Sequence, residues 1–357
     1  MNIGILGLPL TGKTTLFNLL TNQHKQTDSF TSRKTKNIGI AKVADERVDY
    51  LSSVYQPKKT IHATIEVIDI PGIKGDMPEK EKQDIFKQIQ NIDAILMVAR
   101  VFQDDLIPGD VNPLSQIESL IYEILLRDLE ITENRINRLN QSKRKLTHQE
   151  EIEKQLLEKC YQHLSNDQLL ITEKLTEEEL KLLSGFGLFT LKPVVVAINL
   201  DENQLRDETF VDKEKFNQFI QKYQMASITI CGKMEMEINE LPQDEKQLFL
   251  EDLGLQETGV ERLSHVLYNH LGLISFFTVG KDEVRAWTIN EGTTAVKAAG
   301  KIHSDIERGF IRAEVVRFSD FKKLESMQKI KEKGLLKVEG KETIIQDGDI
   351  INFRFNV

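Results

Sequence analysis

The stretch "GLPLTGKT" at residues 7–14 decides the fold prediction. It has the Gly-x-x-x-x-Gly-Lys-Thr pattern of a phosphate-binding loop. An apolar run, "NIGIL" at 2–6, precedes the loop, and a helical stretch, "TTLFNLLT", overlaps its end. A strand before the loop and a helix after it are the context that the pattern requires. We therefore predict that backbone N–H groups of this loop, together with the N-terminus of the helix, bind nucleotide phosphates.

The motif residues have distinct expected roles. Lys13 is expected to reach the β- and γ-phosphates and to be essential for catalysis, while the Thr14 hydroxyl binds Mg²⁺. "VIDIPG" at 67–72 adds Asp69, a second candidate Mg²⁺ ligand, and Gly72, whose N–H can sense the γ-phosphate. The remaining residues expected to line the phosphate site are Leu10, Thr11, Gly12 and Thr15.

Composition narrows the class of protein. The 357 residues are 40% hydrophobic and 29% charged, as in soluble globular proteins of two or three domains. No apolar run approaches the roughly 20 residues of a membrane span, and two cysteines cannot form a disulfide framework, so a reducing cytoplasm is expected. The net charge of −9 argues against sequence-specific DNA binding. Residues 274–357 hold 15 Lys and Arg against 13 Asp and Glu, a net of +2, which favours this end for any RNA or ribosome contact.

The spacing of apolar runs predicts three kinds of structure. Runs at 2–6, 63–70, 93–102, 192–199 and 226–231 alternate with helical stretches, which predicts an α/β domain with a mainly parallel sheet. From Pro113 to about Ser184 a helical stripe broken near "QSKRKLTHQE" predicts an antiparallel helical hairpin, which could equally be a solvated helix pair or a binding arm. After about Leu273, short strands and one helix predict a small α+β domain of β-grasp type.

The chain resembles the Obg-like ATPase family, of the YchF type, over essentially its whole length. Besides the phosphate loop, the resemblance rests on "GDVNPLSQIE", "LKPVVVAINLDE", "CGKMEMEI", "FFTVGKDEVRAWTINEGT", "IHSDIERGFIRAEV" and "IQDGDIINFRFNV". It implies a P-loop NTPase domain in two parts (1–112 and 186–273), an inserted coiled-coil hairpin (113–185) and a ubiquitin-like TGS domain (274–357). It also implies ATP preference over GTP and association with the ribosome or ribosomal RNA.

The base-reading loop departs from the guanine-specific pattern Asn-Lys-x-Asp. The chain has "NLDE" at 199–202, so Glu202 replaces the Asp that accepts two hydrogen bonds from guanine, and its extra methylene pushes the carboxylate into that position. Asn199 can pair with adenine N6 and N7, and Leu200 is expected to offer an apolar wall to the base. In the resemblance, Cys231, Gly232 and Lys233 occupy the family's base-contacting Ser-Ala-Lys position.

Four departures from the family concern hydrolysis. Leu10 replaces an Asn that is a proposed potassium ligand, and "IKGDMPEKEKQDIF" has few glycines after Asp-x-x-Gly. The loop "QDDLIPGDVNP" lacks the family's proposed catalytic His, and the switch I Thr has only ambiguous matches, Thr31 or Thr35. These changes predict good binding of Mg·ATP with slow turnover.

The resulting hypothesis is an ATP-binding switch protein associated with translation, which hydrolyses ATP slowly to ADP and phosphate. Two alternatives remain open at this point. One is an Obg-class GTPase with a degenerate base site. The other is a nucleotide-gated module that binds the ribosome or RNA with negligible hydrolysis.

Overall fold

The computed structural model describes residues 1–23, 36–104, 109–207, 209–252 and 254–356. Thr31 and Thr35, the two switch I candidates, lie outside the described residues. The chain forms two compact units. The first comprises residues 1–40 and 66–263, and the second comprises residues 41–65 and 264–357.

The first unit contains a six-stranded sheet in the order β2-β4-β1-β5-β6-β7. Strand β1 pairs in parallel with both β4 and β5, and β5, β6 and β7 continue the parallel ladder. The strands are β1 (Asn2–Gly7), β2 (Asn37–Lys42), β4 (Thr64–Asp69), β5 (Ala94–Arg100), β6 (Val194–Asn199) and β7 (Ala226–Ile230). Strand β5 is buried throughout, as expected for a central strand covered on both faces. The predicted parallel α/β domain is confirmed.

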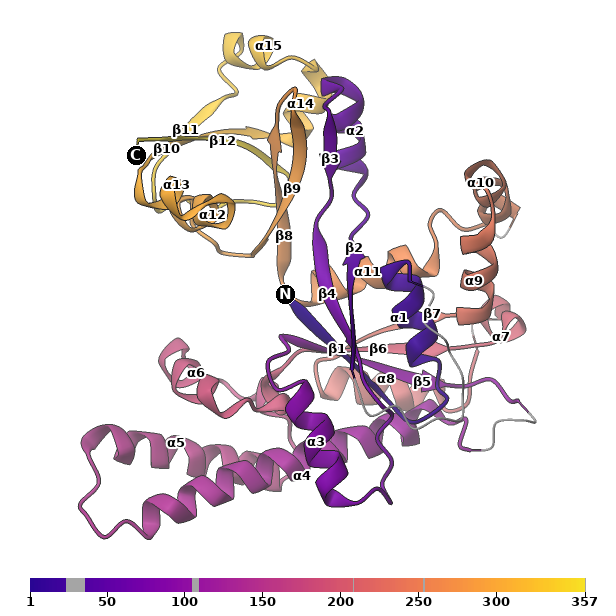
Figure 1. Ribbon diagram of the computed structural model, residues 1–357, viewed down its shortest axis with the longest axis vertical. Helices are drawn as coiled ribbons and strands as arrows, with labels where there is room; N and C mark the ends of the chain where they lie inside the picture. The colour runs from indigo at the N-terminus through magenta and orange to yellow at the C-terminus, as the bar shows by residue number, and fades with distance from the viewer. Residues whose placement is uncertain (24–35, 105–108, 208, 253, 357) are drawn as a thin grey trace. The chain divides into compact units, whose positions relative to one another are not determined.

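Helices connect these strands or follow the last of them (Figure 1). They are α1 (Lys13–Thr21), α3 (Glu79–Gln88), α7 (Glu202–Asp207), α8 (Lys213–Lys222), α9 (Gly232–Glu240), α10 (Gln243–Asp252) and α11 (Gly259–His270). Because parallel strands end at one edge of the sheet, the segments after β1, β4, β6 and β7 meet there. That edge therefore carries the candidate site.

The segment after β5 forms a helical hairpin, as the sequence predicts. Helix α4 (Pro113–Asn140) and helix α5 (His148–Ser165) lie side by side in opposite directions (Figure 1). The cap of α4 is Asn112, with Pro113 as its first residue, and Thr147 and Glu150 form a capping box on α5. A short helix α6 (Glu177–Leu183) and three 3₁₀ turns, Leu170–Thr172, Ser184–Phe186 and Phe189–Leu191, lead back to the sheet.

One buried ion pair fastens the hairpin to the segment that follows Gly72. Lys82 on α3 donates to both carboxylate oxygens of Glu123 on α4, at 2.7 and 2.8 Å. Beside this pair, the Arg127 guanidinium lies over the rings of Phe86 and Phe189. The base of the hairpin is therefore packed against the P-loop sheet rather than loosely tethered.

The second unit has its own six-stranded sheet, in the order β11-β10-β12-β8-β9-β3. Its strands are β3 (Lys59–Ile61), β8 (Leu273–Val279), β9 (Glu283–Asn290), β10 (Phe310–Arg317), β11 (Lys337–Glu339) and β12 (Asp349–Phe355). Its helices are α2 (Glu46–Tyr55), α12 (Ala295–Ile302), α13 (Ser304–Arg308), α14 (Phe318–Leu324) and α15 (Met327–Glu332). Antiparallel hairpins around the parallel pair β8 and β12 agree with the α+β character predicted for this part of the chain.

The structure differs from the sequence-based reading of this unit in two ways. Residues 318–332 form two further helices, α14 and α15, where one helix was expected in the whole domain. Residues 41–65, placed within the P-loop domain by the sequence, pack with residues 264–357. Arg47 on α2 forms ion pairs with Asp45 and Asp347, and the Tyr55 ring stacks on Phe321 at 5.5 Å. No periodicity in the sequence can reveal such pairing, because the partners are about 300 residues apart.

No helix in the described part of the chain is long and apolar enough to cross a membrane.

Candidate nucleotide site

The backbone of the phosphate loop takes a shape that glycine makes possible. Gly12 has φ of +97°, and a Cβ on it would collide with the Asn199 side chain. A Cβ on Gly7 would lie 2.7 Å from the Val98 carbonyl oxygen. Leu10 also has positive φ, +64°, a conformation that is costly for a branched residue. The loop is therefore held in one strained, compact conformation.

The N-terminus of α1 is suited to an anion. The cap residue is Gly12, which has no side chain that could bond to the first N–H groups, and the first turn has no acidic residue. The first N–H groups of a helix lack partners inside the helix, and the helix dipole favours negative charge there. The N-terminus of this nine-residue helix therefore lies at the end of the loop without a side-chain cap.

Lys13 is buried within this loop. Its ammonium donates to the Leu8 carbonyl at 2.6 Å, and its side chain is 7% exposed. The Thr11 hydroxyl donates to the same carbonyl at 3.1 Å. Burial lowers the pKa of Lys13 to about 8, although the negative charge of Asp69 opposes the shift. A negatively charged ligand would restore the charge of this amine.

Thr14 and Asp69 lie together at the C-terminal edge of the sheet. The Thr14 hydroxyl donates to Asp69 Oδ2 at 3.0 Å. The loop after Asp69 packs against the phosphate loop: a Cβ on Gly72 would lie 2.6 Å from the Pro9 nitrogen, and the Ile73 N–H donates to the Gly7 carbonyl at 3.2 Å. The two motifs are thus one packed structure, with a hydroxyl and a carboxylate facing each other beside Lys13.

Asn199 fastens the phosphate loop to the base-reading segment. Its side chain is buried, its Nδ2 donates to the Thr11 carbonyl at 3.1 Å, and its Oδ1 accepts from the Gly232 N–H at 3.0 Å. Both ends of the amide are therefore engaged with backbone groups. In this arrangement Asn199 holds two loops in register, a role that the sequence did not indicate.

Leu200 lies differently from the sequence-based expectation of an apolar wall for the base. Its side chain is 2% exposed and belongs to the main apolar cluster of the first unit. Its N–H donates to the Ile230 carbonyl at 2.8 Å. The expectation failed because the residue after the end of β6 still points into the core. Replacing Leu200 with Lys would bury a charge there.

Asp201 and Glu202 have different surroundings. Asp201 exchanges hydrogen bonds with Gln204, at 2.8 and 3.0 Å, and so caps the start of α7. Glu202 has a half-exposed side chain that pairs with Lys233 at 3.2 Å. That hydrogen bond raises the pKa of the Lys233 amine. The accessible charges of the base-reading segment are therefore one exposed Glu–Lys pair.

The structure brings the predicted residues into two groups on one edge of one sheet. Leu10, Thr11, Gly12, Lys13, Thr14, Thr15, Asp69 and Gly72 lie at the ends of β1 and β4. Asn199, Leu200, Glu202, Cys231, Gly232 and Lys233 lie at the ends of β6 and β7. Cys231 is buried, which raises the pKa of its thiol. Cys231 therefore contributes packing rather than an exposed thiol.

Sequence reasoning missed a further link at this edge. The Gln116 side chain, at the start of α4, accepts from the Arg100 N–H at 2.9 Å and donates to the Arg100 carbonyl at 2.6 Å. Gln116 thereby pairs with the last residue of β5 as a neighbouring strand would. The motif "GDVNPLSQIE" contains this residue, but nothing in the spacing alone identifies its partner.

A parallel sheet with this loop and this second motif defines the class: the chain is a P-loop protein of the GTPase-like type. A family model described as "50S ribosome-binding GTPase" matches residues 2–135. A second model, YchF-GTPase_C, described as "Protein of unknown function (DUF933)", matches residues 273–356.

Full-length relatives define the family more narrowly. The chain is 38% identical over 364 residues to "Ribosome-binding ATPase YchF" of Bacillus subtilis, and the match covers 100% of both chains. It is 36% identical to the protein of the same name from Escherichia coli O157:H7, covering 99% of each. A solved structure, "Structure of the Schizosaccharomyces pombe YchF GTPase", matches with a TM-score of 0.85 and 27% identity, covering 99% of this chain and 97% of that one. The chain belongs to the YchF family.

Proposed function

We propose that this protein binds Mg·ATP at the edge formed by β1, β4, β6 and β7, hydrolyses ATP slowly to ADP and phosphate, and acts as a ribosome-associated switch in the cytoplasm. The observation that carries the proposal is the packed group of Lys13, Thr14, Asp69 and Gly72 beside the uncapped N-terminus of α1. Relatives that match the whole chain are named ribosome-binding ATPases, which supports the same activity and partner.

The chemistry of the phosphate site fits a magnesium ion. Thr14 and Asp69 supply a hydroxyl and a carboxylate whose oxygens lie 3.0 Å apart, and Mg²⁺ prefers such oxygen ligands. We assign these two residues to the metal, Thr14 directly and Asp69 through water. A magnesium ion held by these residues would supply neutralisation of the negative charge of the phosphates during transfer.

Other residues of the site would bind and orient the nucleotide. Lys13 would leave the Leu8 carbonyl for the β- and γ-phosphates, and the Gly72 N–H would meet the γ-phosphate. Leu10, Thr11, Gly12 and Thr15 would surround the phosphates with N–H groups. At the other end, Glu202 and Lys233 would contact the base, and Asn199, Cys231 and Gly232 would hold the loops that enclose it.

The experiment that tests the proposal is multiple-turnover ATP hydrolysis with and without purified ribosomes. We expect slow turnover by the protein alone and faster turnover when ribosomes are added. Binding of ATP without turnover under either condition would favour a nucleotide-gated binding module. Turnover of GTP well above that of ATP would favour an Obg-class GTPase.

The part of the chain that contacts the ribosome can be located by changing its surface charge. We propose that the TGS-like part, residues 274–357, contributes to it through its net charge of +2. Deleting residues 274–357 would be a poor test, because residues 41–65 pack with them and would lose their partner. Charge reversal of Lys323, an exposed lysine on α14, leaves that packing in place. Reduced co-sedimentation with ribosomes, at unchanged ATP affinity, is the expected result.

A further inference from the structure

The sheet of the second unit divides at its centre. Strand β8 pairs with β9 from Leu273 to Val279, and β12 pairs with β10 from Asp349 to Phe355. Between β8 and β12, however, the ladder contains one partner pair, Ile350 with Phe277, preceded by a hydrogen bond from the Gly348 N–H to the Ser275 carbonyl. Beyond Phe277 and Ile350 the ladder between the two strands does not continue.

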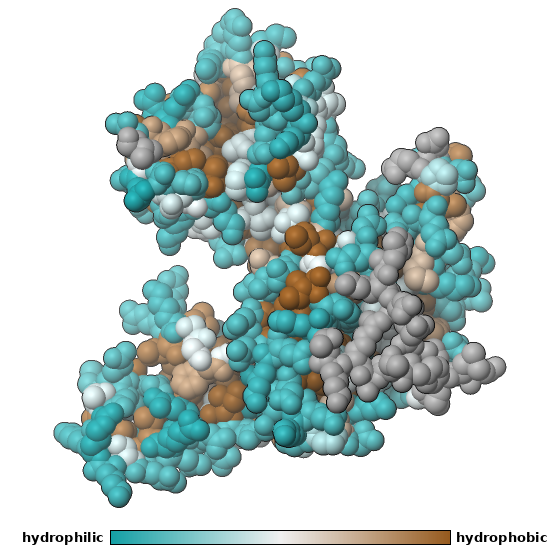
Figure 2. Space-filling model, in the orientation of Figure 1, coloured by the Kyte–Doolittle hydropathy of each residue, from teal (hydrophilic) through white to brown (hydrophobic). Residues whose placement is uncertain are grey.

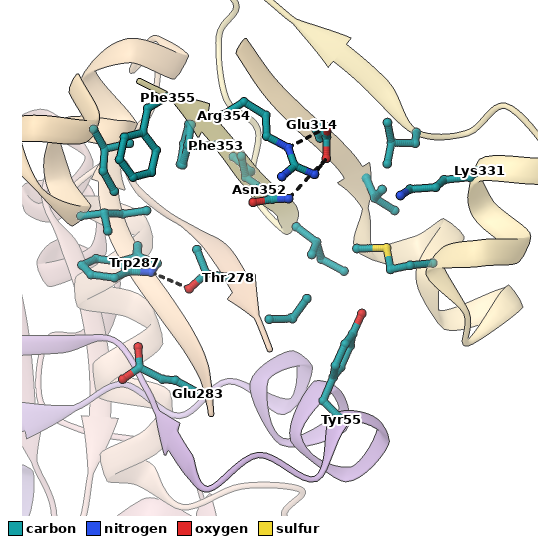
Figure 3. A pocket seen from close by; sticks show the side chains of 18 residues that line it. Tyr55, Thr278, Glu283, Trp287, Glu314, Lys331, Asn352, Phe353, Arg354 and Phe355 are labelled. Atoms are coloured by element: carbon teal, nitrogen blue, oxygen red, sulfur yellow. Dashed lines mark hydrogen bonds and ion pairs between the residues drawn. The ribbon is translucent and has the colours of Figure 1, made fainter. Parts of the chain in front are cut away.

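A cavity of about 530 Å³ occupies this gap. Thr278 and Val279 of β8 line one side, and residues 351–355 of β12 line the other. Figure 3 shows Trp287, Thr278 and Glu283 across the cavity from Arg354, Glu314 and Asn352. On the face drawn in Figure 2, hydrophobic residues lie inside a recess of this unit and hydrophilic residues surround it. The volume is within the range of ligand pockets, which is about 300–1,000 Å³.

The chemistry of the lining favours a polypeptide over a nucleic acid. The charged side chains that line the cavity are two acidic ones, Glu283 and Glu314, and two basic ones, Lys331 and Arg354. Arg354 is already held by Glu314 through two hydrogen bonds of 3.0 Å. The cavity therefore offers no excess of positive charge, on which binding to a phosphate backbone depends.

The edges of the gap specify the conformation of the occupant. In the part of the sheet that the structure describes, the edges of β8 and β12 that face the cavity have no ladder partner beyond Phe277 and Ile350. An open strand edge is a template for another strand, which adds by backbone hydrogen bonds, while pockets receive its alternate side chains. Such pockets exist on one face of β12, where Phe353 and Phe355 lie on the same side as Trp287, Ile302 and Ile306.

We propose that this cavity is a docking site for an extended segment of a partner protein, apolar at alternate residues, which adds as a strand between β8 and β12. Phe355 is 45% exposed at the cavity and would be covered by the segment. This proposal goes beyond the nucleotide chemistry and needs neither ATP nor Mg²⁺.

Trp287 provides a direct readout, because it is the single tryptophan of the chain and lines the cavity. The full-length protein is titrated with a ten-residue peptide that alternates valine with lysine and glutamate. A peptide of similar composition with two central prolines, which cannot complete a strand, is the control ligand. We expect saturable blue-shifted Trp287 emission with the first peptide only.

A matched pair of variants locates the binding. Phe355→Ser removes an exposed ring that lines the cavity, and Ile311→Ser removes a similarly exposed apolar side chain, 58% exposed, that does not. We expect Phe355→Ser to weaken peptide binding at least about fivefold and Ile311→Ser to leave it unchanged, with both circular dichroism spectra like that of the parent protein.

No saturable response, an equal response to the proline peptide, or equal affinity of both variants would overturn the proposal. Stronger binding of a uridine oligonucleotide than of the peptide would also overturn it in favour of RNA. None of these outcomes bears on ATP hydrolysis, which is measured separately.

Discussion

The phosphate end and the base end of the nucleotide site differ in the groups that they can offer a ligand. At the phosphate end, Lys13 bonds to the Leu8 carbonyl and Thr14 bonds to Asp69, and these are contacts of charged and hydroxyl groups that phosphates and Mg²⁺ would replace. At the base end, Asn199, Leu200 and Asp201 are occupied by the protein itself, and the exposed Glu202–Lys233 pair remains for the base. We therefore expect that affinity for the nucleotide comes mainly from contacts with its phosphates, and that selectivity for the base is modest.

The largest effect is expected at the phosphate end. Lys13→Ala removes the buried ammonium that is expected to follow the γ-phosphate into the transition state, so ATP turnover should fall about 10²–10³-fold. Lys80→Ala, an exposed lysine on α3, is the matched control and should keep full turnover. Single-turnover hydrolysis measures both. Substantial turnover by Lys13→Ala would show that another group fills this role.

The next effect concerns stability rather than catalysis. Asn199→Ala leaves the Thr11 carbonyl and the Gly232 N–H without their buried partner. We expect the free energy of unfolding of the first unit to fall by about 1–3 kcal/mol. Asn203→Ala, an exposed asparagine on α7, should change it by less than about 0.5 kcal/mol. Urea titration without nucleotide provides the measurement, and equal stability of the two variants would mean that Asn199 does not hold the loops together.

A smaller effect should appear as a function of pH. Lys13 has its pKa lowered to about 8 by burial, and the charges of a bound triphosphate would raise it again. Binding should therefore take up a proton above about pH 8, and affinity for Mg·ATP should fall by up to about tenfold per pH unit there. Calorimetry in two buffers of different ionisation enthalpy detects the proton. Affinity that is constant from pH 7.5 to 9.5 would contradict the assigned environment of Lys13.

The lowered pKa of Lys13 also affects how the free energy of unfolding of the nucleotide-free protein depends on pH. Between about pH 8 and the ordinary lysine pKa of 10.5, the unfolded chain binds more protons at Lys13 than the folded chain does. The contribution of Lys13 to the free energy of unfolding should accordingly rise with pH across that window and be constant below it. Comparing the pH dependence of urea midpoints for the parent protein and Lys13→Met isolates this contribution.

The sequence predicts the parallel sheet, the helical hairpin and the phosphate loop because each follows from local spacing. "GLPLTGKT" and "VIDIPG" specify their own backbone shapes, and both occur where the structure has the corresponding turns. The sequence could not predict that Arg47 pairs with Asp347, that Leu200 points into the core or that Asn199 bonds to two loops. These depend on contacts between segments distant in sequence, which no periodicity encodes. The base end was therefore less predictable than the phosphate end.

The buried position of Leu200 determines how base selectivity can be tested. Restoring the Asn-Lys-x-Asp pattern would require both Glu202→Asp and Leu200→Lys. Because Leu200 is buried in the core, the second substitution would destabilise the fold and obscure the first. Glu202→Asp alone, at an exposed position, is the clean test of base selectivity.

The most direct test of the account is a competition titration that compares Mg·ATP with Mg·GTP on the unmodified protein. With affinity supplied by the phosphate end and Glu202 in place of the guanine-reading Asp, ATP should bind at least as tightly as GTP. A preference for GTP of tenfold or more, about 1.4 kcal/mol, would contradict it.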